Sequence, residues 1–115
     1  MPSMTPFEFG DIVLVPFPFT DQSATKKRPA VVISSSVYNS ERPDLIIMAV
    51  TSRIKPTTTI GEAMVQDWQA AGLLRPSVIK PVITTIEKRL VIKIMGRLKK
   101  GDQKALRGSL ERILG

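Results

Sequence analysis

Two strongly apolar segments that end in polar side chains constrain the fold of this chain more than any other feature. They run from Lys26 to Ser34 and from Leu45 to Ser52. Short runs of Val, Ile and Ala between polar loops are typical of buried β-strands. Pro29 biases Arg28 toward an extended backbone, so the first of these strands effectively starts at Arg28. Because strand ends can present an anion-binding group and a hydroxyl together, we expect a phosphate site there.

Other short apolar runs predict further strands at 11–15, 62–65, 77–85 and 90–95. Pro81 lies inside one of these runs and indicates an edge strand or a bulge, because proline lacks a ladder donor. The polar stretches 20–27, 34–44 and 53–61 are interpreted as loops. Residues 66–71 are interpreted as one or two helical turns, with Gly72 as the left-handed terminator.

The carboxyl-terminal segment has the pattern of an amphipathic helix. Asp102 is a good N-cap, and the apolar face of the predicted helix consists of Leu106, Leu110, Ile113 and Leu114. Gly108 disfavours a helix interior, and we interpret it as a sign that another element packs closely there. Five or six strands and one helix predict a mainly β fold with α additions, a small barrel-like domain over residues 1–115.

Composition and charge exclude several classes of protein. The chain has 115 residues with no Cys and no His, so a disulfide framework, a thiolate metal site and histidine catalysis are all ruled out. No apolar run is long enough to cross a bilayer and the amino terminus does not resemble a signal peptide, so we expect a cytoplasmic protein. The net charge is +7, and residues 87–112 hold nine Lys and Arg against three Asp and Glu. Such a basic field attracts polyanions, but for an isolated charge run a solvated basic face is the better explanation, so charge alone does not decide.

Arg28 and Thr51 are the first candidates for chemistry. An arginine guanidinium offers a planar fork of donors that suits a phosphate, and a threonine hydroxyl can donate to a phosphate oxygen. Read from the residues alone, both also have structural explanations, because arginine stems cover apolar neighbours and threonine hydroxyls bond to local backbone. Further polar groups that can contact the same ligand are Lys26, Lys27, Ser52, Arg53, Lys55, Lys80 and Thr84. We find no Gly-rich phosphate loop and no metal-ligand cluster.

The order of several short motifs resembles the MazF/PemK family of toxins, which belong to type II toxin–antitoxin systems. The motifs are Gly10-Asp11, Arg28-Pro29 with an aliphatic strand ending at Ser34, Tyr38-Asn39, and Ala49-Val50-Thr51-Ser52. Later segments of the family pattern are matched by Gly72-Leu73-Leu74, Ser77-Val78-Ile79 and Thr85-Ile86-Glu87-Lys88-Arg89-Leu90. The resemblance covers nearly the whole chain.

This resemblance implies an SH3-like β-barrel with short helices and a C-terminal helix, and usually a homodimer. It implies a sequence-selective endoribonuclease that cleaves single-stranded RNA without a metal or other cofactor and is inhibited by an acidic antitoxin. The family's catalytic arginine and threonine correspond to Arg28 and Thr51. The implied reaction is attack of the RNA 2′-hydroxyl on the adjacent phosphate, which gives a 2′,3′-cyclic phosphate and a 5′-hydroxyl end. Asp21 is a candidate proton acceptor.

Two alternatives remain open at the level of sequence. The first is a protein-binding poison on the same barrel, like the CcdB toxins that trap DNA gyrase, in which Arg28 has no role. The second is a non-catalytic RNA-binding barrel, which requires only the basic charge and predicts salt-dependent binding without cleavage.

Overall fold

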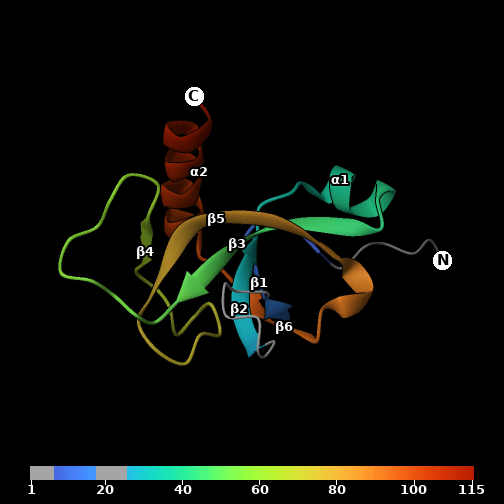
Figure 1. Cartoon of the computed structure of the whole chain (residues 1–115), viewed down its shortest axis with the longest axis horizontal. Coiled ribbons are helices and arrows are strands. Elements are labelled where there is room, and N and C mark those ends of the chain that lie inside the picture. The colour runs from blue at the N-terminus through green and yellow to red at the C-terminus, as the bar shows by residue number, and fades with distance from the viewer. Residues whose placement is uncertain (1–6, 18–25) are drawn as a thin grey trace.

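The computed structural model describes residues 7–17 and 26–115, which form six strands, two α-helices and one 3₁₀ helix (Figure 1). In chain order the elements are β1 (Asp11–Phe17), β2 (Lys26–Val32), α1 (Ser36–Glu41), β3 (Asp44–Thr51), β4 (Ala63–Val65), β5 (Ser77–Glu87), the 3₁₀ helix η1 (Lys88–Leu90), β6 (Lys93–Arg97) and α2 (Lys100–Leu114). The predicted mainly β fold with a C-terminal helix is confirmed.

All six strands belong to one curled antiparallel sheet with the order β4-β5-β3-β2-β1-β6. Alternate residues of its central strands point to opposite faces, so the sheet supports two separate cores. One contains Val13, Ala30 and Ile47, and the other contains Ile12 and Val31. In this order β2 and β3 are neighbours, so the strands that carry Arg28 and Thr51 lie side by side in the middle of the sheet.

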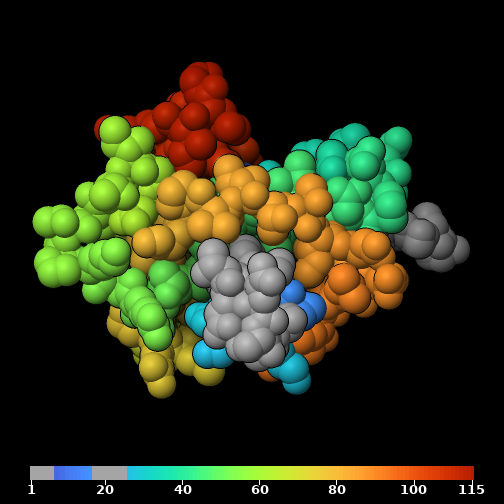
Figure 2. Space-filling model, viewed as in Figure 1, coloured from blue at the N-terminus to red at the C-terminus, as the bar shows by residue number. Residues whose placement is uncertain are grey.

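The long strand β5 crosses the molecule between the α1 and α2 ends, as Figures 1 and 2 show. Its pairing with β3 shifts register between Met48, which faces Ile83, and Val50, which faces Ile79. One residue of β3, Ala49, lies between those two pairs, but three residues of β5 do. Pro81 is the middle one of these three, so it lies in the bulge. The predicted bulge at Pro81 is confirmed, because a residue without an N–H fits where the ladder is interrupted.

The stretch 34–44, predicted to be a loop, contains the six-residue helix α1. Ser35 is its N-cap and accepts a hydrogen bond from the Tyr38 backbone N–H at 3.1 Å. The buried residue of this helix is Asn39, whose amide donates to the carbonyls of Phe7 and Ser34. The loop prediction was wrong because a helix of less than two turns that buries a polar residue leaves no apolar period to detect.

Helix α2 begins at Lys100 rather than after Asp102, so the predicted N-cap was wrong. Asp102 is buried in the first turn, where its two carboxylate oxygens accept the backbone N–H groups of Gln66 and Asp67, each at 2.9 Å. Of the predicted apolar face, Leu106 is fully buried while Leu114 is 72% exposed at the helix end. The last turn therefore extends beyond the sheet that it was expected to cover.

The interpretation of Gly108 was also wrong. A Cβ atom built on this glycine meets no heavy atom within 4 Å. The close approach occurs instead between Gly72 and Gly96, where a Cβ on Gly72 lies 2.1 Å from the Met95 carbonyl oxygen and one on Gly96 lies 2.3 Å from that of Ala71. Two glycines allow the backbone of the turn to lie directly on β6.

The turn at 66–72 is a series of hydrogen-bonded turns rather than a regular helix, and Gly72 ends it with a φ of +87°, as predicted. Strand β6 begins three residues later than the predicted 90–95, because Lys88–Leu90 forms the 3₁₀ helix η1. Neither of the two α-helices in the described part of the chain is long and apolar enough to span a membrane.

Candidate functional site

A groove of about 560 Å³ lies where β2 begins and β3 ends. Arg28 and Thr51 both line it, so the structure brings together the two predicted strand ends. Apolar side chains form much of the remaining surface, among them Leu14, Val50 and Met95. The groove is thus a cationic and hydroxyl-bearing site beside an apolar floor.

The sheet register explains why these two residues meet. Strands β2 and β3 are antiparallel, and Ala30 pairs with Ala49. Arg28 lies two residues before Ala30 in β2, and Thr51 lies two residues after Ala49 at the end of β3. The antiparallel register therefore brings the start of β2 and the end of β3 to the same end of the sheet.

The Thr51 hydroxyl takes part in a local hydrogen bond with the backbone that follows β3. Its oxygen accepts a hydrogen bond from the Arg53 backbone N–H at 3.1 Å, just past the end of β3. A hydroxyl has one proton to donate and two acceptor positions. The bond from Arg53 uses an acceptor position, so the proton of Thr51 can be donated to a ligand oxygen.

Four of the other predicted binding residues line the same groove, namely Lys26, Lys27, Ser52 and Arg53. Lys55, Lys80 and Thr84 do not line it. Lys80 is ion-paired to Glu62 at 3.1 Å, and this contact lowers the pKa of the Glu62 carboxyl. The proposed contacts of Lys55, Lys80 and Thr84 with RNA stay predictions.

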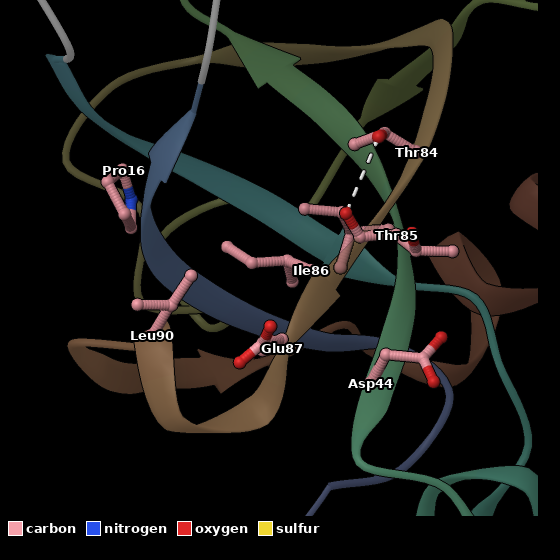
Figure 3. A pocket seen from close by; sticks show the side chains of 8 residues that line it. Pro16, Asp44, Thr84, Thr85, Ile86, Glu87 and Leu90 are labelled. Atoms are coloured by element: carbon pink, nitrogen blue, oxygen red, sulfur yellow. Dashed lines mark hydrogen bonds between the residues drawn. The ribbon is translucent and has the colours of Figure 1, made fainter.

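Thr84 lines a different pocket of about 370 Å³, shown in Figure 3. In that pocket its hydroxyl points toward the Thr85 carbonyl oxygen at 3.5 Å, and the surrounding side chains include Asp44, Glu87 and Leu90. The pKa of the Asp44 carboxyl is lowered by a hydrogen bond from the Tyr38 hydroxyl at 2.7 Å and by Arg42. Both carboxylates of this second pocket are ion-paired, Asp44 to Arg42 and Glu87 to Arg89.

Two groove residues were missed by the reasoning from sequence. Arg75 and Ser77 line the groove from the start of β5, which pairs with the end of β3 through Val78 and Thr51. A signal for Arg75 was present, because Arg75-Pro76 repeats the Arg28-Pro29 pair directly before a predicted strand.

The charge of the groove has one sign. Among the described residues that line it are five Lys or Arg side chains and no Asp or Glu; the five are Lys26, Lys27, Arg28, Arg53 and Arg75. Within residues 7–17 and 26–115, no three His, Cys, Asp or Glu side chains gather as a metal site requires. The sequence leaves the general base unidentified, and its one candidate, Asp21, lies outside the described residues. The arrangement is suited to bind the phosphates of a polyanion.

Comparison with known proteins agrees with this fold. A protein-family model, described as the PemK-like, MazF-like toxin of type II toxin–antitoxin systems, matches residues 8–114. No curated protein sequence matches the chain.

Several solved structures share the fold at low sequence identity. A mycobacterial endoribonuclease in complex with its cognate antitoxin superposes with a TM-score of 0.76 at 15% identity, covering 94% of each chain. A MazE–MazF structure from Deinococcus radiodurans gives 0.73 at 23% identity, covering 96% of this chain and 97% of that one. The Mycobacterium tuberculosis toxin MazF-mt6 gives 0.71 at 19% identity, covering 87% and 91%.

Proposed function

The chain belongs to the family of PemK-like, MazF-like toxins of type II toxin–antitoxin systems, and we propose that it is a sequence-selective endoribonuclease that cleaves single-stranded RNA without a metal. The observation that carries this proposal is that Arg28 and Thr51 line one cationic groove. An arginine fork and a hydroxyl donor are complementary to a phosphodiester. The endoribonuclease named among the structures with this fold adds support.

The proposed reaction uses the 2′-hydroxyl of the substrate as the nucleophile. Its oxygen attacks the adjacent phosphorus, the bond from phosphorus to the 5′ oxygen breaks, and the products are a 2′,3′-cyclic phosphate and a 5′-hydroxyl. The proton leaves the 2′ oxygen for a base, for which Asp21 is our candidate, and the departing 5′ oxygen takes up a proton.

Arg28 and Thr51 are the proposed catalytic residues. Negative charge grows on the non-bridging oxygens of phosphorus as the 2′ oxygen attacks. The guanidinium of Arg28 stabilises that charge, because its N–H donors can bond to the oxygens on which the charge grows. The Thr51 proton, which the bond from the Arg53 N–H leaves available, fixes the position of the phosphate. Neighbouring phosphates of the RNA are bound by the other polar residues of the groove, namely Lys26, Lys27, Ser52 and Arg53.

The experiment is cleavage of mixed-sequence RNA in EDTA by the wild-type protein and Arg28→Ala. We expect the wild type to produce 5′-hydroxyl ends and the variant to be slower by about a hundredfold or more. Arg89→Ala is the matched control, because Arg89 is exposed, pairs only locally with Glu87 and lies outside the groove. RNA left intact by the wild type contradicts the proposal.

The variants Arg28→Ala and Thr51→Ala separate the alternatives. Growth arrest that persists in Arg28→Ala and Thr51→Ala cells favours a protein-binding poison. Salt-dependent RNA binding without any product favours a non-catalytic RNA-binding barrel.

We further propose that a cognate acidic antitoxin neutralises the basic groove. The five groove cations support this, since an acidic segment that is disordered when free can fold onto such a surface. Co-purification from the native host should recover a small acidic protein. Recovery of the toxin alone argues against this partner.

A homodimer is the proposed assembly. Apolar side chains stay exposed on and beside two strands, namely Val82, Ile83, Leu90, Ile92 and Ile94. An association surface on which these side chains form one continuous patch would bury them. Sedimentation equilibrium should give twice the mass of 12.7 kDa, and a purely monomeric species contradicts the assembly.

A further inference from the structure

The groove has a second arginine that is presented in the same way as Arg28. The sequence contains three Arg-Pro pairs, and each arginine lies in or just before a strand. Arg28 and Arg75 line the groove, whereas Arg42 is ion-paired to Asp44 at 3.0 Å. Proline biases the residue before it toward an extended backbone. The main chain of Arg75 is therefore biased toward the extended conformation, as that of Arg28 is.

Ser77 fixes the main chain of Arg75 from the other side. The Ser77 hydroxyl is buried and donates to the Arg75 carbonyl oxygen at 2.8 Å. This bond uses the only proton that the hydroxyl has, so Ser77 cannot also donate to a phosphate. Its place in the groove wall is explained by holding Arg75, which makes it a positioning residue.

The chain leading to Arg75 is equally well anchored. Asp102 holds the backbone N–H groups of Gln66 and Asp67, and Gly72 lies against the backbone of β6. Leu73 is buried directly after that contact, while the next residue, Leu74, is 85% exposed. The segment before Arg75 is thus anchored to α2 and β6 as far as Leu73.

The five groove cations come from two walls. Lys26, Lys27 and Arg28 belong to β2, whereas Arg53 follows β3 and Arg75 precedes β5. Thr51 pairs with Val78 of β5, so the Arg75 wall adjoins Thr51 on the side away from Arg28. A strand of RNA whose phosphate is held between Arg28 and Thr51 continues along one of these walls.

Given the proposed ribonuclease function, on which this inference rests, we propose that Arg75 binds a phosphate next to the scissile one in a single-stranded RNA. Ser77 acts by positioning Arg75. Arg75 contributes to holding the substrate and not to the bond-breaking step. Loss of its side chain should therefore raise KM and leave kcat nearly unchanged.

The test measures binding of a fluorescent mixed-sequence RNA oligonucleotide with 2′-O-methyl sugars, which has no nucleophile and cannot be cleaved. For Arg75→Ala we expect about tenfold weaker binding, and a fall of roughly 0.7 in the slope of log K against log salt between about 50 and 200 mM. Ser77→Ala should bind about threefold more weakly with the slope unchanged, because the charge remains. Circular dichroism melts confirm that each variant is folded.

Arg42→Ala is the matched control, since it removes an equal charge from an Arg-Pro pair outside the groove. We expect its slope to match the wild type. An Arg75→Ala protein that behaves like Arg42→Ala overturns the proposal. The proposed catalytic role of Arg28 has its own test. If Arg28→Ala cleaves unmodified RNA as fast as the wild type, that role is wrong, even when Arg75→Ala still lowers the salt slope.

Discussion

At the scale of single residues, the site depends on groups whose remaining hydrogen-bonding capacity is set by their neighbours. The Thr51 hydroxyl oxygen accepts a hydrogen bond from the Arg53 N–H, so its proton can be donated to a ligand. The Ser77 hydroxyl already donates its proton to the Arg75 carbonyl oxygen. Two hydroxyls in one groove therefore have opposite roles. The distinction follows from hydrogen bonds and not from the residue types.

The role of the Thr51 hydroxyl is tested by replacing it with groups of matched shape or matched chemistry. We expect Thr51→Val, which removes the hydroxyl, to lower kcat/KM for RNA cleavage by about ten- to a hundredfold. Thr51→Ser, which keeps the hydroxyl, should stay within about fivefold of the wild type. Steady-state cleavage kinetics on one RNA substrate provide the measurement.

Both Thr51 variants should remain folded, because Thr51 is only partly buried at a strand end. We expect their free energies of unfolding to differ from the wild type by less than about 1 kcal/mol. A fully active Thr51→Val protein shows that the hydroxyl takes no part in the reaction.

At the scale of secondary-structure elements, the groove depends on how the turn at 66–72 is attached. Asp102 of α2 binds one end of the turn, and the backbone contact between Gly72 and Gly96 holds the other end on β6. The turn leads into the segment that carries Arg75. Helix α2 thus supports the groove wall without lining it.

Alanine should have opposite effects on the free energy of unfolding at a crowded glycine, Gly72, and at an open one, Gly108. Gly72→Ala should lower the free energy of unfolding by about 3 kcal/mol or more, because the new Cβ overlaps the Met95 carbonyl oxygen and φ is +87°. Gly108→Ala should raise it by about 0.5–1 kcal/mol, because Gly108 lies in a helix with open space around it. Urea unfolding of the two variants gives both values.

Gly101 is a second control, since a Cβ there also meets nothing within 4 Å. Equal stability of Gly72→Ala and Gly101→Ala contradicts the tight packing of the turn on β6.

At the scale of the whole molecule, cations without carboxylates gather at one place. The groove at the start of β2 is lined by five cations, whereas Asp44 and Glu87 of the pocket in Figure 3 are each ion-paired to an arginine. A cationic field of this kind steers an anionic strand toward the groove and falls with added salt. The net charge of +7 alone does not distinguish the two regions.

The dependence of stability on pH follows from which groups have shifted pKa values. The pKa of Glu62 is lowered chiefly by its hydrogen bond with Lys80, and that of Asp44 chiefly by its hydrogen bond from Tyr38. A carboxyl with a lowered folded-state pKa stabilises the fold above its unfolded value, and this contribution is lost as the pH falls through the folded value. We therefore expect the free energy of unfolding to decrease below about pH 5.

Between about pH 6 and 9 the stability should be nearly constant, because the chain has no His and no Cys to titrate there. Chemical denaturation at a series of pH values measures the profile. Lys80→Met should flatten its acidic part, since Glu62 then loses the partner that lowers its pKa. An unchanged profile in that variant contradicts this assignment.

The sequence by itself determined most strands, the terminal helix, and Arg28 and Thr51 as candidates, because short β-branched runs and an Arg-Pro pair are local patterns. It missed α1 and misplaced the start of α2, since the buried groups there are Asn39 and Asp102 rather than apolar side chains. The physical reason is that a polar residue is buried only where a partner distant in sequence satisfies it.

The choice of polar residues that share the groove depends on strand pairing and could not be predicted. The tertiary structure brought Arg75 to the site and left Lys80 in an ion pair with Glu62, although both lie near the start of β5. The packing of the turn on β6 also explains why Gly72 must be a glycine, whereas Gly108 need not be one. Register and bulges set these outcomes, because strand pairing joins residues far apart in the chain and leaves no local trace in the sequence.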